Sequence, residues 1–205
     1  RSRDLVSVDA TSRRYALGPG ALGLGQAYLA RMDLRRLAAP ELAWLSAESG
    51  ETATLSIRTG DQRMYIDQVV PTREVRMEVQ VGAVHPLHAG ASSKAFLAYL
   101  PEADVEDYIA RTRLSPVTAG TITDPEALRE ELARIRRNGY AISLGERQAG
   151  AGSVAAPIRD AGGLPLGVVS VSGPIERFRE EVDSCAALLL AATRRLSLRM
   201  GFRGL

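Results

Sequence analysis

The chain has 205 residues, of which 45% are hydrophobic and 24% are charged, and its formal net charge is +2. This length suits one large domain or one domain with an appendage, and the composition is typical of a globular protein with a core. No run of 18 apolar residues occurs, and the N-terminal residues lack a signal-peptide core. We therefore expect a cytoplasmic protein without a membrane span. The small net charge gives only weak support for direct binding of nucleic acid.

The N-terminal quarter predicts a hairpin followed by two helices. Two short extended runs between Leu5 and Gly18 flank a polar turn at Asp9–Ser12. A first apolar stripe at helical spacing then contains Leu22, Leu29 and Met32, and a second runs from Leu34 to Leu45. We expect Pro40 in the first turn of the second helix and Gly50 directly after its end.

Three strands and a helical middle follow. The strands are predicted at 53–57, 64–70 and 75–81, and the third has the cleanest alternation of apolar and polar residues in the chain. Two short helices are predicted over 92–100 and 101–110. The next helix has the clearest boundaries, because Thr123–Glu126 offers capping residues with a first-turn proline and Asn138-Gly139 is a stop signal.

The C-terminal third returns to strands, at 140–143, 154–159 and 166–172, and ends in a long helix over 174–200. The last two strands are joined by Asp160–Gly163, which is a hairpin signal. Cys185, the only cysteine, lies in the apolar part of that helix and is predicted to be a buried structural thiol. Strands, helices, strands and a helix over one antiparallel sheet predict an α+β fold.

No constellation of residues predicts catalysis, a metal or a cofactor. The two histidines, His85 and His88, share a proline-containing loop and have no cysteine pair beside them, so we interpret them as structural or as lining a ligand site. The nucleophile elbow and the phosphate-binding loop are absent. The glycines of GPGALGLG read as a loop and a helix start.

Two serines on one strand are the best candidates for ligand contact. Ser170 and Ser172 are two residues apart in an otherwise apolar strand, so both hydroxyls point to one face. They either bind a small carboxylate or hydroxyl compound, or they form hydrogen bonds with the backbone and with water.

Five stretches, taken together, resemble the isocitrate lyase regulator (IclR) family of transcription factors. In the order of that family, they are RRYALGPGALGLG (13–25), LSAESGETATLSIRTGDQRMYIDQV (45–69), VGAVHPLHAGASSKAFLAYLP (81–101), IRRNGYAISLGERQAGAGSVAAPIRDAGG (135–163) and LGVVSVSGPIERF (166–178). The resemblance implies a GAF/PAS-like antiparallel sheet, flanked by helices, that cups a small-molecule effector.

The resemblance also implies effector-contacting positions, which are Gly82, Ala83, Leu87, Ser143, Glu146, Ser153, Ser170 and Ser172. Ser143 stands where the family has an acidic pocket residue, and Ser153 stands where it often has a cysteine. Ser93 replaces the glycine that usually precedes the lysine of the third stretch. The implied pocket is therefore more neutral and richer in hydroxyls, and Glu146 is expected to supply an acid nearby.

The resemblance implies the organisation of the chain as well. Residues 1–18 are expected to be the wing hairpin of a winged helix-turn-helix whose recognition helices lie upstream, 19–33 a linker helix, and 34–205 the effector-binding domain. The expected partners are a small organic or aromatic acid, operator DNA through the N-terminal domain, and further copies of the chain in a dimer or tetramer. Two rival interpretations stay open: a GAF-like enzyme, and an oligomerisation module with a vestigial pocket.

Overall fold

The computed structural model describes residues 5–8, 14–30 and 33–204. The chain forms two compact units, residues 1–37 and 38–205. In the first unit, the predicted hairpin and helix start are confirmed: β1 (Val6–Val8) pairs with β2 (Tyr15–Leu17), and α1 spans Pro19–Ala30. The turn predicted at Asp9–Ser12 and the position of Met32 lie outside the described residues.

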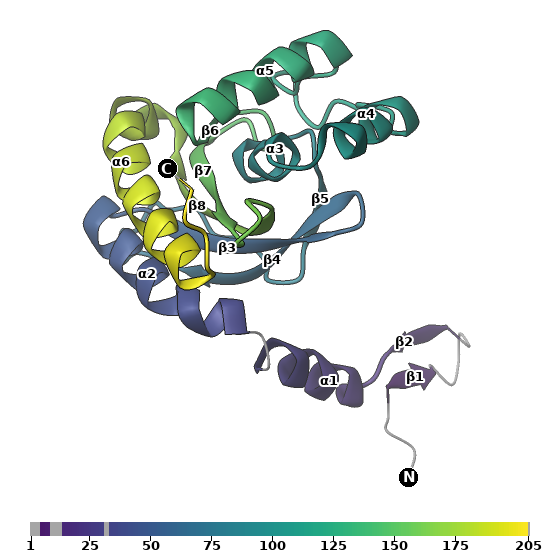
Figure 1. The fold of residues 1–205 in the computed structure, drawn as a ribbon. Coiled ribbons are helices and arrows are strands. Elements are labelled where there is room, and N and C mark those ends of the chain that lie inside the picture. The colour runs from purple at the N-terminus through teal and green to yellow at the C-terminus, as the bar shows by residue number, and fades with distance from the viewer. Residues whose placement is uncertain (1–4, 9–13, 31–32, 205) are drawn as a thin grey trace. The chain divides into compact units, whose positions relative to one another are not determined.

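The second unit is built on one antiparallel sheet with strand order β5-β4-β3-β8-β7-β6 (Figure 1). Its strands are β3 (Thr52–Thr59), β4 (Gln62–Val69), β5 (Val84–Pro86), β6 (Ala141–Leu144), β7 (Ala151–Arg159) and β8 (Pro165–Pro174). The remaining helices are α2 (Asp33–Ser49), α3 (Ala91–Ala98), α4 (Glu102–Arg111), α5 (Pro125–Asn138) and α6 (Ile175–Arg199). The predicted α+β fold is confirmed. None of the helices in the described part of the chain is long and apolar enough to cross a bilayer.

Helices cover both faces of the sheet. The core on one face joins α3, α4 and α5 to Ala155 of β7 and Val168 of β8. The other face of β7 receives α6, because Gly152 lies against the ring of Phe178. Figure 1 shows α2 beside α6, away from α3, α4 and α5. An ion pair between Arg195 and Glu41 joins α6 to α2.

Local signals set the ends of α5 as predicted. The Asp124 carboxylate accepts a hydrogen bond from the backbone N–H of Ala127 at 2.8 Å, which satisfies a donor that the first turn leaves free. At the other end, Gly139 adopts a left-handed conformation with φ 83°, which only glycine enters at little cost.

The strand predicted over 75–81 is wrong. Instead of pairing through its backbone, this segment is held by the side-chain amide of Gln68, which donates to the carbonyl of Val79 at 2.7 Å and accepts from its N–H at 2.9 Å. The alternating pattern reflects half-buried Met77 and Val79 between exposed neighbours. The edge strand beside β4 is β5, which the alternation did not indicate.

The predicted place of Pro40 is also wrong. The second helix begins at Asp33, so Pro40 lies inside it and not in its first turn. Proline lacks the N–H that a helix interior uses, and its ring disturbs the preceding turn. Pro40 is exposed on the helix. Gly50 follows the end of the helix, as predicted, with φ 66°.

Gly152→Ala is expected to destabilise the fold because its new methyl group would lie 2.7 Å from the Cβ of Phe178, where α6 meets β7. Overpacking of this kind costs about 1–3 kcal/mol, which for a chain of this size lowers the melting temperature by about 2–12 °C. Gly150→Ala is the matched control, since nothing lies within 4 Å of the added carbon. Equal melting temperatures for the two variants in thermal unfolding would contradict this account of the packing.

Candidate functional site

Hydroxyl side chains form a line across four strands. In the strand registers, Thr52 lies opposite Ser172, Ser172 opposite Ser153, and Ser153 opposite Ser143. Residues paired across an antiparallel sheet point to the same face, so these four side chains share the face that carries α3. Ser170 belongs to the next row, where it lies opposite Thr54. The structure therefore brings together the four serines that were predicted as site residues.

A narrow cavity of about 20 Å³ lies over this part of the sheet. That volume accommodates about one water molecule, so a larger ligand requires side chains to move. The four predicted serines line it, together with Arg63, Tyr65, Met77, Gly90, Ala91, Ser92, Arg147, Gln148 and Ala151.

Arg63 is the most unusual of these residues, because its charge is buried without an anion. The residue is 1% exposed, and no carboxylate of the described residues forms an ion pair with it. Its guanidinium donates to three hydroxyls, those of Ser93 at 2.9 Å, Tyr65 at 2.9 Å and Ser56 at 3.2 Å. Burial lowers the pKa of Arg63. A buried cation held only by neutral groups is costly, and an anion brought to it gains strongly charge-assisted bonds.

A second arginine approaches from the loop after β6. The guanidinium carbon of Arg63 lies 4.2 Å from the centre of the Tyr65 ring, and that of Arg147 lies 6.0 Å from it. No ion pair joins Arg147 to an acidic residue in the part of the chain that the structure describes. The cavity is thus bordered by hydroxyls and two positive charges.

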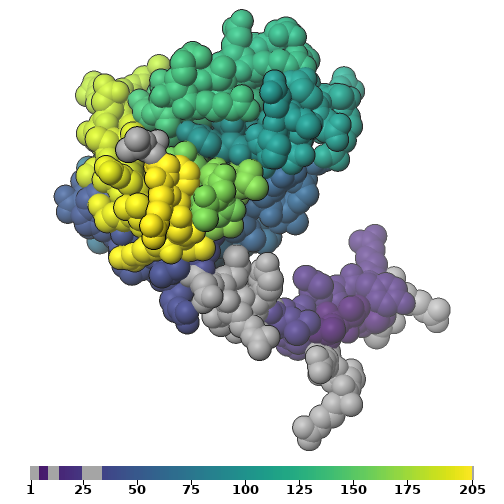
Figure 2. All heavy atoms as spheres, viewed as in Figure 1, coloured from purple at the N-terminus to yellow at the C-terminus, as the bar shows by residue number. Residues whose placement is uncertain are grey.

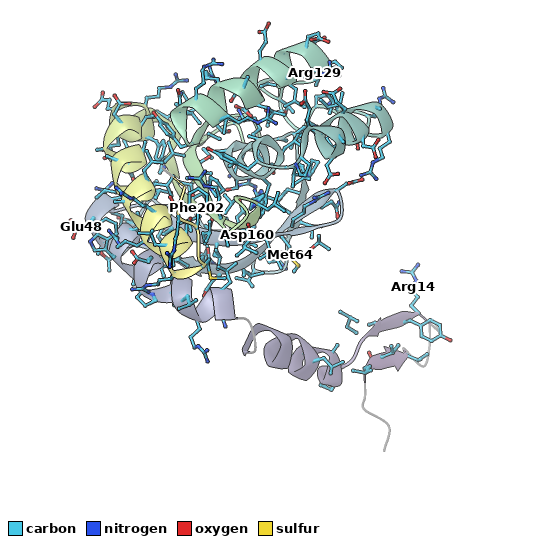
Figure 3. The ribbon with its side chains drawn as sticks, in the orientation of Figure 1. Arg14, Glu48, Met64, Arg129, Asp160 and Phe202 are labelled. Atoms are coloured by element: carbon cyan, nitrogen blue, oxygen red, sulfur yellow. The ribbon has the colours of Figure 1, made fainter. Side chains whose placement is uncertain are left out.

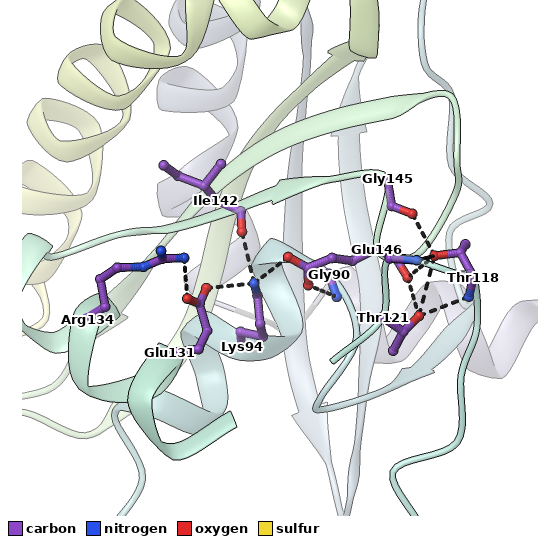
Figure 4. A network of polar contacts seen from close by, with 10 residues as sticks. Gly90, Lys94, Thr118, Thr121, Glu131, Arg134, Ile142, Gly145 and Glu146 are labelled. Atoms are coloured by element: carbon purple, nitrogen blue, oxygen red, sulfur yellow. Dashed lines mark hydrogen bonds and ion pairs between the residues drawn. The ribbon is translucent and has the colours of Figure 1, made fainter. Parts of the chain in front are cut away.

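The loop that carries Arg147 is anchored through its neighbour, Glu146 (Figure 4). The Glu146 carboxylate accepts from Lys94 at 2.5 Å and from the N–H of Gly90 at 3.3 Å. Its backbone carbonyl accepts from the hydroxyls of Thr121 at 2.6 Å and Thr118 at 2.9 Å. Glu146 therefore holds the loop in place and is not among the residues that line the cavity.

Lys94, the only lysine, is the centre of this network. Its side chain is 1% exposed and its ammonium donates to Glu131 at 2.7 Å, to Glu146 and to the carbonyl of Ile142 at 3.0 Å. Burial raises the pKa of Glu146, and the charge of Lys94 opposes that rise. Since two carboxylates surround it, Lys94 has no charge to offer a ligand.

The other predicted site residues lie elsewhere. The N–H groups of Gly82 and Ala83 donate to the carbonyls of Tyr65 at 2.8 Å and Gln80 at 3.1 Å, so both have partners within the protein. Leu87 is fully buried in the core under α3. None of the three lines the cavity; Gly90, with φ 87°, and Ala91 line it instead.

Nine residues of the cavity wall were missed from the sequence, and a signal existed for three of them. Arg63 and Tyr65 alternate along β4, which places both on one face, although the predicted strand begins one residue after Arg63. Gly90 lies two residues before the helix predicted over 92–100, in a connection where glycine can adopt a backbone conformation that other residues avoid.

His88 and Cys185 are buried, and neither lines the cavity. His88 is buried between the hydroxyl of Tyr108 at 2.9 Å and the carbonyl of Ser115 at 3.0 Å. Burial raises the pKa of the Cys185 thiol to about 11, so it is protonated near neutral pH. Within the described ranges, no group of three histidine, cysteine or acidic residues could hold a metal ion.

Lys94→Met is expected to lower the free energy of unfolding by about 3–5 kcal/mol, because it leaves two carboxylates, Glu131 and Glu146, without their buried counter-charge. Arg134→Met is a matched control, since Arg134 also pairs with Glu131 but is 57% exposed, and an exposed pair contributes about 0–1 kcal/mol. Urea denaturation of both variants measures the difference. Similar losses would show that Lys94 is not the support of this region.

The lowered pKa of His85 predicts that the free energy of unfolding depends on pH. Burial, with the charges of Arg63 and Arg147, lowers the pKa of His85 to about 4 from 6.5. Between pH 6.5 and 4 the unfolded chain therefore binds a proton that the folded chain does not, so the free energy of unfolding falls as the pH falls. His85→Asn removes this contribution, and its stability should decline less than that of the wild type between pH 7 and pH 4.5. Parallel declines in urea denaturation would refute the lowered pKa.

Comparison with known proteins identifies the family of the chain. The family model described as "Bacterial transcriptional regulator IclR C-terminal" matches residues 26–198. The chain is 34% identical over 170 residues to the HTH-type transcriptional regulator KipR of Bacillus subtilis, covering 83% of this chain and 68% of that protein. It is 33% identical over 190 residues to the transcriptional repressor IclR of Escherichia coli, covering 91% of this chain and 69% of the repressor.

Solved structures of regulators of this kind also superpose on the chain. The crystal structure of Thermotoga maritima IclR superposes with a TM-score of 0.86 at 31% identity, covering 98% of this chain and 81% of that one. The C-terminal domain of the E. coli regulator KdgR superposes with a TM-score of 0.75 at 30% identity, covering 83% of this chain and 100% of that domain. The relatives are regulators and not enzymes, and the chain belongs to the IclR family of bacterial transcriptional regulators, whose effector-binding domain it contains.

Proposed function

We propose that the cavity over the hydroxyl line binds a small organic acid, and that its occupancy changes operator binding. The observation that carries this proposal is Arg63, a fully buried guanidinium whose hydrogen-bond partners among the described residues are three neutral hydroxyls. A carboxylate is the anion that a guanidinium and several hydroxyls recognise together.

The serines supply the remaining hydrogen bonds in this proposal. The hydroxyls of Ser170 and Thr54 lie 2.7 Å apart, so one donates to the other and the acceptor keeps its own hydrogen. When Thr54 is the donor, Ser170 keeps its hydrogen for the ligand, and Ser143, Ser153 and Ser172 offer theirs. In the proposed complex, Arg147 contacts the carboxylate from its place on the loop after β6. The space of about 20 Å³ implies that binding moves this arginine and its neighbours outward.

The remaining predicted residues take supporting roles. Glu146 positions Arg147 through its bonds to Lys94 and Gly90. Gly82 and Ala83 hold the segment beside β4 through backbone bonds, and Leu87 anchors the segment that leads to Gly90 in the core.

The regulatory step uses a difference in affinity between two states. Arg63 bonds Ser93 of α3, so an anion that draws Arg63 toward it also acts on α3. We propose that the protein works as a dimer or tetramer in the cytoplasm, with residues 1–18 as the wing hairpin of the DNA-binding domain, 19–33 as the linker helix and 34–205 as the effector-binding domain. The oligomer has one arrangement that binds the operator and one that does not. The effector changes operator affinity by at most the factor by which its own affinity for these two arrangements differs. Relatives named as repressors support a repressor role.

A ligand screen with matched neutral compounds tests the proposal. Pyruvate, malonate and benzoate are compared with their amides by thermal shift, and a ligand at 100 times its dissociation constant adds about 2.7 kcal/mol, or about 5–10 °C. Arg63→Gln is expected to lower the affinity for an acid that binds by about ten- to hundredfold, because it removes a charge-assisted bond. Arg113→Gln, an exposed arginine elsewhere, should leave it unchanged.

Equal shifts for acids and amides would contradict recognition of a carboxylate. An acid that stabilises the wild type and Arg63→Gln equally would remove Arg63 from the site. No shift with a broad panel of acids would favour the rival interpretation of a vestigial pocket.

A further inference from the structure

A second hollow lies at the other end of β7 and has a volume of about 440 Å³. Its walls come from the C-terminal half of α6, the end of β7 and the segment after α6. From Ser153, on the wall of the first cavity, to Arg159, on the wall of this one, β7 advances six residues, or about 20 Å. The two spaces share no lining residue.

The hollow combines apolar walls with positive charge. Leu190, Leu198 and Phe202 supply carbon surface, and Arg159, Arg194 and Arg203 supply three guanidinium groups. No aspartate or glutamate lines it. Over residues 5–8, 14–30 and 33–204, none of the three arginines forms an ion pair with an acidic side chain.

The side chain of Arg159 packs against two aromatic rings. Its guanidinium carbon lies 3.8 Å from the centre of the Phe202 ring and 5.4 Å from that of Tyr99. Its backbone N–H donates to the hydroxyl of Ser197 on α6 at 3.0 Å. A β-bridge between Asp160 and Gly201 ties the segment after α6 to the end of β7. Figure 2 shows the yellow C-terminal segment against the green one, and Figure 3 labels Phe202 on the first and Asp160 on the second.

We propose that this hollow is a second small-molecule site, separate from the effector cavity, for an organic anion with an apolar body, in the first instance an aromatic carboxylate. The carboxylate would pair with Arg159 and Arg194, and the ring would pack on Phe202 and Leu198. Its size lies within the range of 300–1,000 Å³ typical of small-molecule pockets. Unpaired guanidinium groups beside an aromatic ring favour a planar, negatively charged ligand over a neutral one.

Titration of the full chain with 4-fluorobenzoate, followed by ¹⁹F NMR, tests the proposal, and 4-fluorobenzamide is the neutral control. Arg159→Gln is expected to weaken binding of the acid about tenfold, the effect of losing one charge-assisted bond. Arg179→Gln, an exposed arginine at the other end of α6, should leave the affinity unchanged. Arg63→Gln should leave unchanged the binding event that Arg159→Gln weakens, because Arg63 belongs to the other cavity, where an acid can bind separately.

Leu198→Glu is a second variant of the hollow, which keeps the test valid if Arg159→Gln does not fold. Leu198 is 56% exposed, so the new carboxylate can be accommodated while it repels an anion from the hollow. A loss of affinity in this variant supports the site. The proposal is overturned if the wild type does not bind the acid, if acid and amide bind equally, if Arg63→Gln abolishes binding, or if both hollow variants bind like the wild type.

Discussion

Lys94 joins the parts of the fold on which the cavity depends. Its ammonium, buried on α3, meets a carboxylate from α5, a carboxylate from the loop after β6 and a carbonyl of β6. A charge in such a place is tolerated only when opposite charges and hydrogen bonds compensate its lost hydration. The two carboxylates supply that compensation, and in doing so they fix the loop that carries Arg147 and Gln148 to the cavity wall.

The second buried cation has the opposite balance. Arg63 lies as deep as Lys94, yet hydroxyls surround it where carboxylates surround Lys94. Both cations contact α3, one through Ser93 and the other because it is part of the helix. Lys94 is therefore neutralised within the protein and stabilises the fold, whereas Arg63 lacks an anion that a ligand can supply. The proposed preference for a carboxylate effector rests on that difference.

The sheet brings separate hydroxyl side chains into one row. Ser143, Ser153 and Ser172 are far apart in sequence, and they become neighbours because the registers of β6, β7 and β8 place them in one row. On the opposite face, Gly152 gives α6 room to pack. β7 thus presents Gly152 to α6 on one face and the hydroxyl of Ser153 to the cavity on the other, as its period of two requires.

The sequence by itself determined the α+β class, the ends of α5 and the family, because these depend on local periodicity, capping residues and ordered motifs. The four serines also followed from it, since motifs preserve position along the chain. Only the tertiary structure decided the rest. Residues 75–81 lie outside the sheet, where the side-chain amide of Gln68 forms hydrogen bonds with the backbone of Val79. The alternation of apolar and polar residues does not predict that contact. Arg63 became a candidate anion-binding residue only when burial and the absence of an acidic partner among the described residues were known. Charge compensation depends on which groups meet in space, and a linear pattern does not record that.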